Sequence, residues 1–144
     1  MPDTLHPDAV RALVEQLIPF NRYLGLRLES VDPAAGCLTT RLPLRPEFVG
    51  NAMRDIPHGG VVSALIDATA GAAAALSLDD LALAERVATI DMRVDYLRAA
   101  QGDQLHASAR VMRSGRTVIV VRTDVTDDSG ELVALGSNAF HVAR

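Results

Sequence analysis

The sequence predicts an α+β protein in which an antiparallel sheet wraps around one long central helix. From Gly59 to Ser77 the chain is apolar around the whole helical wheel, which is typical of a helix buried on all sides. Further along, apolar and polar residues alternate in segments that are separated by turn residues, which is typical of strands. Because helix and strands follow one another in blocks, an antiparallel sheet packed on a helix is the expected architecture.

The elements before the central helix follow from periodicity and from turn residues. Residues 1–24 form an N-terminal helical segment, in which apolar residues recur at helical spacing until Pro19 interrupts the pattern. Residues 26–31 and 37–44 predict a hairpin around the turn at residues 32–36. Residues 45–57 contain several Pro and Gly residues and are interpreted as a loop leading to the helix.

A meander of four strands follows the central helix after a connection over residues 78–86. Residues 87–97, 105–111, 117–126 and 132–142 carry the alternating pattern, with hairpin signals such as Ser-Gly between them. In the first of these segments, strict alternation places Thr89 on the polar face together with its charged neighbours. The pattern therefore predicts about six strands in all.

Length and composition favour one soluble domain over residues 1–144. The chain is 49% hydrophobic with a net charge of −4 and has no run rich in Lys or Arg, which argues against nucleic-acid binding. Its single cysteine, Cys37, excludes an internal disulfide and a multi-cysteine metal site. No secretion signal begins the sequence, so the cytoplasm is expected. A membrane span is disfavoured because Asp67 lies at the centre of the apolar helix.

The few polar groups of the central helix indicate a site. Asp67 is a carboxylate on a helix that should be buried, and such a group needs a partner or a function. Gly60, Ser63, Asp67 and Gly71 fall on one stripe, where small side chains leave room for a ligand or a neighbouring backbone. At the helix start, two glycines expose backbone N–H groups that suit an oxyanion. The central helix thus combines backbone hydrogen-bond donors at its start with a carboxylic acid, Asp67, further along.

Together these residues resemble the PaaI-like hotdog-fold acyl-CoA thioesterases. The resemblance rests on Asn51, on His58-Gly59-Gly60 with Asp67, and on residues 89–98 and 113–118, and it covers roughly residues 20–142. It implies a six-stranded sheet around the helix, edge-to-edge pairing of two subunits, and often a tetramer of two dimers. It further implies an acyl-CoA substrate and no metal or redox cofactor.

The resemblance also implies roles for individual residues. Asp67 corresponds to the general base or nucleophile, and the Gly59 N–H to the donor that polarises the thioester carbonyl, supplied by the other subunit. Asn51 would help to place the attacking water. Thr89 stands where relatives carry a Ser or Thr near the carboxylate, and His58 is the motif histidine that precedes the glycines.

Further residues are expected to contact substrate. Gly60 and Ser63 lie beside the reacting group, and the turn Arg113-Ser114-Gly115-Arg116 resembles the segment that meets the nucleotide end of CoA. Simpler interpretations stay open: the histidine ring holds the loop, the asparagine is a turn residue, and the paired arginines are a solvated hairpin tip. Side chains that precede the helix are candidates for an acyl pocket, namely Phe48, Val49, Met53 and Ile56.

Three functions remain in competition at this point. The first is an acyl-CoA thioesterase, and the second is a module of the same fold that binds acyl-CoA without hydrolysing it. Asp67 favours the enzyme, because simple binding does not need a carboxylate beside the thioester. The third, a hydratase or dehydratase, pairs a histidine with an acid in an arrangement that this sequence does not show.

Overall fold

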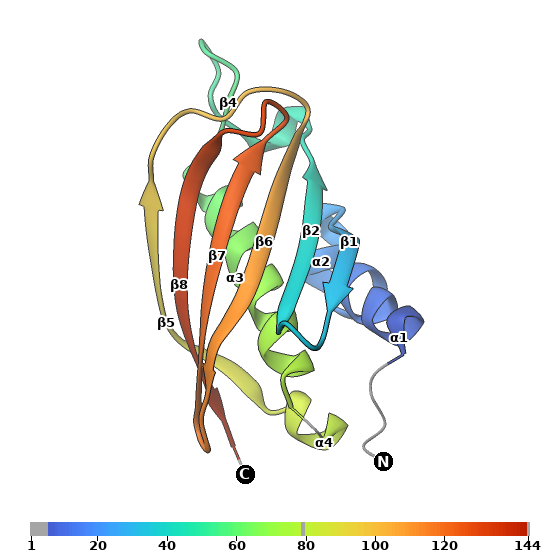
Figure 1. Ribbon diagram of the computed structural model, residues 1–144. Coiled ribbons are helices and arrows are strands. Elements are labelled where there is room, and N and C mark those ends of the chain that lie inside the picture. Colours follow the sequence, from blue (N-terminus) through green and yellow to red (C-terminus); the bar gives the residue numbers. More distant parts are fainter. Residues whose placement is uncertain (1–5, 79, 144) are drawn as a thin grey trace.

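The structure is a computed structural model that describes residues 6–78 and 80–143, and it consists of a curved sheet with one long helix against its face (Figure 1). The N-terminal segment comprises α1 (Pro7–Ala12), a π-helical turn (Leu13–Leu17) and α2 (Pro19–Leu24). The central helix α3 spans Gly59–Leu76. The main sheet contains β1 (Arg27–Asp32), β2 (Cys37–Pro43), β5 (Val87–Tyr96), β6 (Gln104–Ser114), β7 (Val118–Asp127) and β8 (Leu132–Val142).

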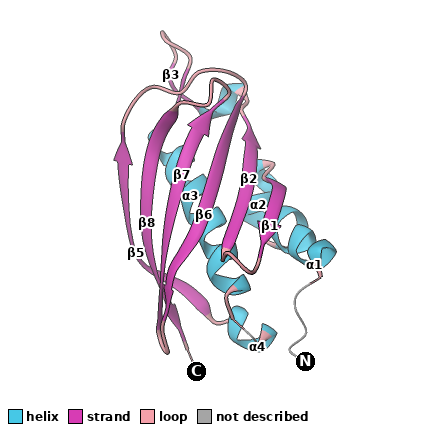
Figure 2. Ribbon diagram, in the orientation of Figure 1, coloured by secondary structure: helices cyan, strands magenta, loops and turns pink. Residues whose placement is uncertain are grey.

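The six strands are antiparallel and lie in the order β1-β2-β6-β7-β8-β5. The described helices lie on one face of this sheet, and no described helix covers the opposite face (Figure 2). The predicted α+β architecture, with an antiparallel sheet around a long central helix, is therefore confirmed. The first hairpin, the four-strand meander and the interruption at Pro19 also lie where the sequence predicts them.

The central helix is buried by its contacts with the sheet. Leu65, Ile66 and Ala70 are fully buried, and α3 packs against β2, β5, β6, β7 and β8. A Cβ added at Gly136 would lie 2.4 Å from the Ile66 side chain, so the absence of a side chain there lets β8 approach the helix. Among the described residues, α3 is the helix long and apolar enough to cross a membrane, and its packing makes it the core helix of this fold.

The segments on either side of α3 contain more structure than the sequence predicts. Residues 45–57 include a single 3₁₀ turn (Pro46–Phe48) and a small two-stranded sheet of β3 (Val49–Asn51) and β4 (Ile56–Pro57). The connection after α3 contains the short helix α4 (Leu81–Ala84). Residue 79, in the same connection, lies outside the described residues. The Pro and Gly content of residues 45–57 hid the small sheet, because those residues are typical of loops.

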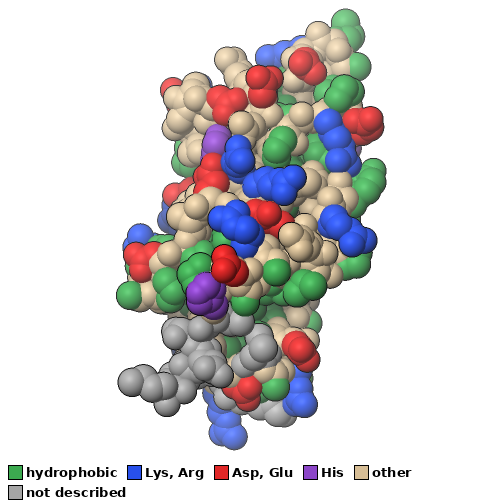
Figure 3. All heavy atoms as spheres, turned by 90° about the vertical axis from the view of Figure 1, so that its right-hand side faces the viewer, with side chains coloured by type: hydrophobic (Ala, Val, Ile, Leu, Met, Phe, Trp, Pro, Cys, Tyr) green, Lys and Arg blue, Asp and Glu red, His purple; other side chains and the backbone are tan. Residues whose placement is uncertain are grey.

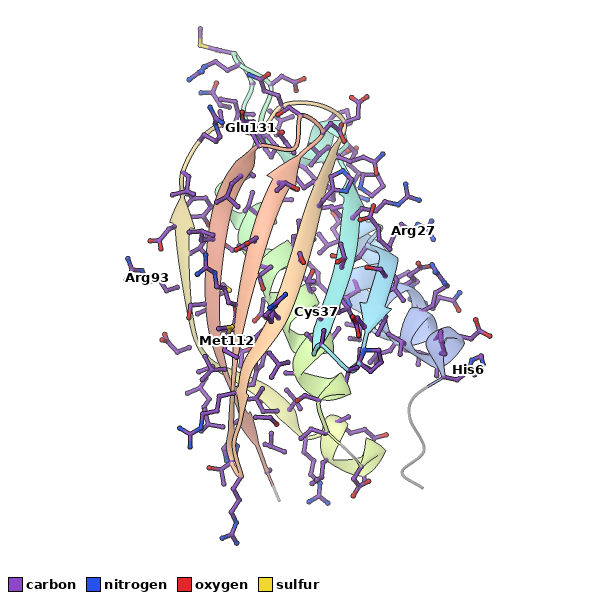
Figure 4. The ribbon with its side chains drawn as sticks, viewed as in Figure 1. His6, Arg27, Cys37, Arg93, Met112 and Glu131 are labelled. Carbon is purple, nitrogen blue, oxygen red and sulfur yellow. The ribbon has the colours of Figure 1, made fainter. Side chains whose placement is uncertain are left out.

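The two edges of the main sheet differ. At the β1 edge, side chains of the N-terminal segment bind the strand backbone: Arg11 donates to the Leu28 carbonyl at 3.1 Å, and the Leu28 N–H donates to Glu15 at 3.0 Å. Acidic and basic side chains lie side by side over this side of the molecule (Figure 3). At the β5 edge, where Arg93 projects outward (Figure 4), no hydrogen bond within the described residues reaches the outer backbone. An unpaired edge of this kind is a template for another strand.

We predict that Glu15→Gln destabilises the fold by about 1–2 kcal/mol at pH 7, since its carboxylate ties β1 to the helices. Burial by itself raises the pKa of Glu15, but the Leu28 N–H, Arg11 and Arg27 together lower it below the ordinary value. Because the folded-state pKa is lowered, this contribution is present above about pH 4.3 and is lost as the pH falls through the folded-state value.

Urea unfolding at pH 7 and at pH 4 tests this prediction. The difference between wild type and Glu15→Gln should shrink at the lower pH. Glu47→Gln is the matched control, because the Glu47 side chain is 69% exposed and its ion pair with Arg45 spans 3.9 Å, so little change is expected. An equal destabilisation by both variants, or one that does not vary with pH, would contradict the argument.

Candidate active site

Asp67 is held by two side chains of the sheet. Thr89 Oγ1 on β5 and Asn138 Nδ2 on β8 each donate a hydrogen bond to Asp67 Oδ1, both at 3.0 Å. Within the described residues, no hydrogen bond reaches Asp67 Oδ2. The half-buried carboxylate is therefore oriented through one oxygen, while the other remains available to a ligand.

Thr89 reaches Asp67 because of an irregularity in β5. The pairing of β5 with β8 shifts between Thr89 and Asp91, so that Ile90 is an extra residue. Thr89 lies opposite the buried Phe140 on the helix side, whereas Asp91 lies opposite Ala139 on the outer side. The assignment of Thr89 to the polar outer face, which assumed strict alternation, is therefore wrong. A β-bulge reverses the face on which the following residues lie.

Asn138 is a site residue that the sequence analysis missed. Its side chain is 1% exposed and lies on the inner face of β8, opposite Met92 and Val121. A signal was present, because an asparagine in an inward position of an otherwise apolar strand needs a partner. Its carbonyl oxygen Oδ1 has no hydrogen-bond partner within the described residues.

The two glycines at the start of α3, Gly59 and Gly60, differ in the hydrogen bonding of their N–H groups. His58 Nδ1 accepts the Gly60 N–H at 2.8 Å, so the histidine ring caps the helix and uses that donor. Within the described residues, the Gly59 N–H forms no hydrogen bond. Of the two expected oxyanion donors, Gly59 thus offers its N–H to a ligand. A catalytic part for His58 and substrate contact by Gly60 remain predictions.

Ser63 and Tyr96 support the same turn. Ser63 Oγ donates to the Gly59 carbonyl at 3.1 Å, Tyr96 OH donates to it at 2.8 Å, and the two hydroxyl groups also contact each other. A Cβ added at Gly59 would lie 3.4 Å from the Tyr96 ring. These contacts fix the backbone around Gly59, and contact of Ser63 with substrate remains a prediction.

Gly59 and Asp67 of one chain are too far apart to act on one carbonyl group. They are separated by eight residues on a continuous helix, which corresponds to about 12 Å along its axis. An oxyanion donor must lie about 3 Å from the oxygen that becomes charged, beside the attacking group. A complete thioester site therefore needs an N–H from another source near Asp67.

Beside Asp67 lies an apolar groove of about 530 Å³, within the size range of ligand pockets. One wall comes from the N-terminal helical segment, the floor from α3, and the other wall from β5 and the region before it. Its lining residues are Ala9, Leu13, Leu17, Ile18, Phe20, Asn21, Ala64, Asp67, Ala68, Gly71, Ala72, Ala75, Ala84, Glu85, Val87, Thr89 and Phe140. Small side chains of α3 leave this space. Asp67 and Gly71 of the predicted stripe line it, whereas Gly60 and Ser63 do not.

The remaining predicted residues lie outside the groove. Asn51 Oδ1 accepts the N–H groups of Met53 and Arg54, both at 3.2 Å, so Asn51 stabilises the turn between β3 and β4. The turn at residues 113–116 lies beyond the far end of α3, where its Ser114, Gly115 and Arg116 line a separate cavity with Ser77. The candidate pocket residues Phe48, Val49, Met53 and Ile56 do not line the groove beside Asp67.

Comparisons with known proteins agree with this fold. The family model described as thioesterase superfamily matches residues 56–134. The medium/long-chain acyl-CoA thioesterase YigI of Salmonella typhimurium is 33% identical over 135 residues, covering 87% of this chain and 86% of the relative.

Two solved structures share the fold at similar identity. A protein of Shewanella oneidensis related to the thioesterase superfamily superposes with a TM-score of 0.82 at 31% identity and covers 94% of both chains. A phenylacetic acid degradation-related protein of Ralstonia eutropha superposes with a TM-score of 0.79 at 29% identity and covers 92% of this chain and 97% of that one.

The sheet wrapped on a central helix is the hotdog fold, and the family model and relatives show that the chain is a thioester hydrolase. The chain belongs to the thioesterase superfamily, and the resemblance to PaaI-like proteins is confirmed. Among residues 6–78 and 80–143, no group of three or more His, Cys, Asp and Glu residues is placed to hold a metal ion.

We predict that Thr89→Val and Asn138→Ala each lower kcat about ten- to hundredfold with a smaller change in KM, because each variant removes a hydrogen bond to a charged group. Thiol release from acyl-CoA measures both constants. Thr123→Val is the control, since Thr123 is a buried polar residue on the neighbouring β7 whose hydroxyl forms no hydrogen bond within the described residues. Unchanged kcat in folded Thr89 and Asn138 variants would show that these bonds do not matter for turnover.

Proposed function

We propose that this protein is an acyl-CoA thioesterase that hydrolyses medium- to long-chain acyl-CoAs. The observation that carries the proposal is the Asp67 carboxylate, bound through Oδ1 by Thr89 and Asn138 and open through Oδ2 at an apolar groove. Such a groove suits an aliphatic chain, because burial of methylene groups supplies binding free energy. The relative named for medium and long chains, 33% identical, supports this substrate class.

The chemistry follows from the available oxygen of Asp67. As a general base, Oδ2 takes a proton from water while the water oxygen attacks the thioester carbonyl carbon. As a nucleophile, Oδ2 attacks that carbon itself, and water then cleaves the resulting anhydride. In both routes the C–S bond breaks, CoA leaves as the thiolate and takes up a proton, and the free acid is released. Thr89 and Asn138 keep the carboxylate in position through these steps.

The oxyanion donor in this proposal comes from a second subunit. Pairing of β5 with β5 of a second copy would satisfy the open edge and extend the sheet across a two-fold axis. It would also bring another helix start toward the β5 side of Asp67. We therefore assign the N–H that stabilises the charged oxygen to Gly59 of the partner subunit, because Gly59 of the same chain lies too far along α3.

The nucleotide end of CoA is assigned to the turn between β6 and β7. Arg113 and Arg116 lie there, and guanidinium groups suit phosphate. Ser114, Gly115 and Arg116 line a cavity that also borders the end of α3. In this arrangement the acyl chain and the nucleotide occupy different regions of the surface.

We predict that Asp67→Asn lowers kcat by about 10²–10⁴, the range typical for loss of a catalytic acid or base, while the fold and acyl-CoA binding persist. Thiol release from a panel of short, medium, long and aryl acyl-CoAs measures the effect. Asp124→Asn is the matched control, because Asp124 pairs with Arg122 on the outer face of the sheet. Binding without turnover by the wild type would favour the non-catalytic module instead.

A mixing experiment tests the shared site. Gly59→Pro removes the N–H at the first helical position, where proline is tolerated, and Asp67→Asn removes the base. Each variant alone should be inactive. Co-expressed, the two should regain about a quarter of wild-type activity, since half of the dimers are mixed and each has one complete site. A mixture as inactive as its parents would place the site within one subunit.

A further inference from the structure

The groove beside Asp67 contains a buried amide without a partner. Asn21 on α2 lines the groove, its side chain is 3% exposed, and Nδ2 forms no hydrogen bond within the described residues. Buried polar groups are nearly always paired, so an orphaned donor calls for an explanation. It lies in the wall of the same groove as the proposed catalytic carboxylate.

The fold itself does not use this side chain. Asn21 serves α2 through its backbone, whose carbonyl accepts the N–H groups of Gly25 and Leu26, both at 3.1 Å. Any residue would provide that carbonyl. A leucine of similar size would fill the same space without leaving a buried amide unpaired, so the side chain carries a cost that packing does not explain.

The other polar residues of the groove differ from Asn21. Asp67 is only half-buried and its available oxygen is assigned to the reacting carbonyl, Thr89 donates to Asp67, and Glu85 is exposed. All remaining lining side chains are apolar or glycine. Asn21 is therefore the buried polar side chain of this groove, within the described residues, that has capacity for a ligand.

We infer that Asn21 recognises an oxygen substituent on the acyl group, so that the groove selects chains bearing a neutral hydroxyl or ketone. The last torsion of an asparagine side chain is broad, and a turn of the amide presents either its N–H or its carbonyl to the groove. Among the described residues, no Lys or Arg lines the groove, and Asp67 and Glu85 both disfavour an anionic substituent. This inference rests on the proposed function and names its substrate more closely.

Binding distinguishes the inference from the proposed hydrolysis. The probes are non-hydrolysable thioether analogues of decanoyl-CoA, unsubstituted or with one hydroxyl or ketone at successive chain carbons. Calorimetry measures Kd for the wild type, for Asn21→Leu and for Thr123→Val, whose orphaned hydroxyl does not line the groove. Thiol release from the matching thioesters is measured in parallel.

At one chain position, the wild type and Thr123→Val should bind the oxygenated analogue about tenfold more tightly than the unsubstituted one. Asn21→Leu should lose this preference while binding the unsubstituted analogue as well as the wild type. Equal binding of both analogues by the wild type at every position overturns the inference, whether or not Asn21→Leu folds. Selective binding without thiol release would uphold it and refute the proposed hydrolysis.

Discussion

The structure depends on how one carboxylate is accommodated on a helix that is otherwise without charge and mostly apolar. Asp67 lies in the middle of α3, and a charge there is costly unless hydrogen bonds compensate it. Thr89 and Asn138 supply them from the two strands at one end of the sheet. These bonds fix the rotation of α3 against β5 and β8. They leave the second carboxylate oxygen unpaired beside the groove, and the proposed chemistry uses that oxygen.

The same end of the sheet has an open edge. The other edge is closed by Arg11 and Glu15, which bind the backbone of β1, whereas β5 has no such cover within the described residues. Long edge strands are normally protected, so the open edge of β5 supports the proposed pairing with a second subunit. The length of α3 leads to the same conclusion, because the Gly59 N–H and the Asp67 carboxylate cannot meet within one chain. The open edge of β5 and the distance between Gly59 and Asp67 along α3 together support the proposed site shared between two subunits.

Much of this arrangement follows from sequence pattern, and the failures have physical causes. The apolar stretch after His58 predicted α3, and period-two alternation predicted the strands, because both depend on burial. Asp67 stood out as the misfit in that helix. Thr89 was assigned to the wrong face, because one extra residue in β5 reverses the alternation and no local signal marks it. Asn138 escaped notice because its partner is 71 residues away in the chain.

In the proposed function, reaction chemistry and substrate choice come from different parts of the chain. The family model covers residues 56–134, which include the helix start, Asp67 and Thr89. The wall of the groove formed by the N-terminal helical segment, with Asn21, lies outside that region. Proteins that share this core can therefore retain the carboxylate and the edge strand while the segment packed against α3 differs between them. In the proposed function, the side chains of that segment that line the groove would alter acyl specificity, whereas Arg11 and Glu15 of the same segment hold the β1 edge of the sheet.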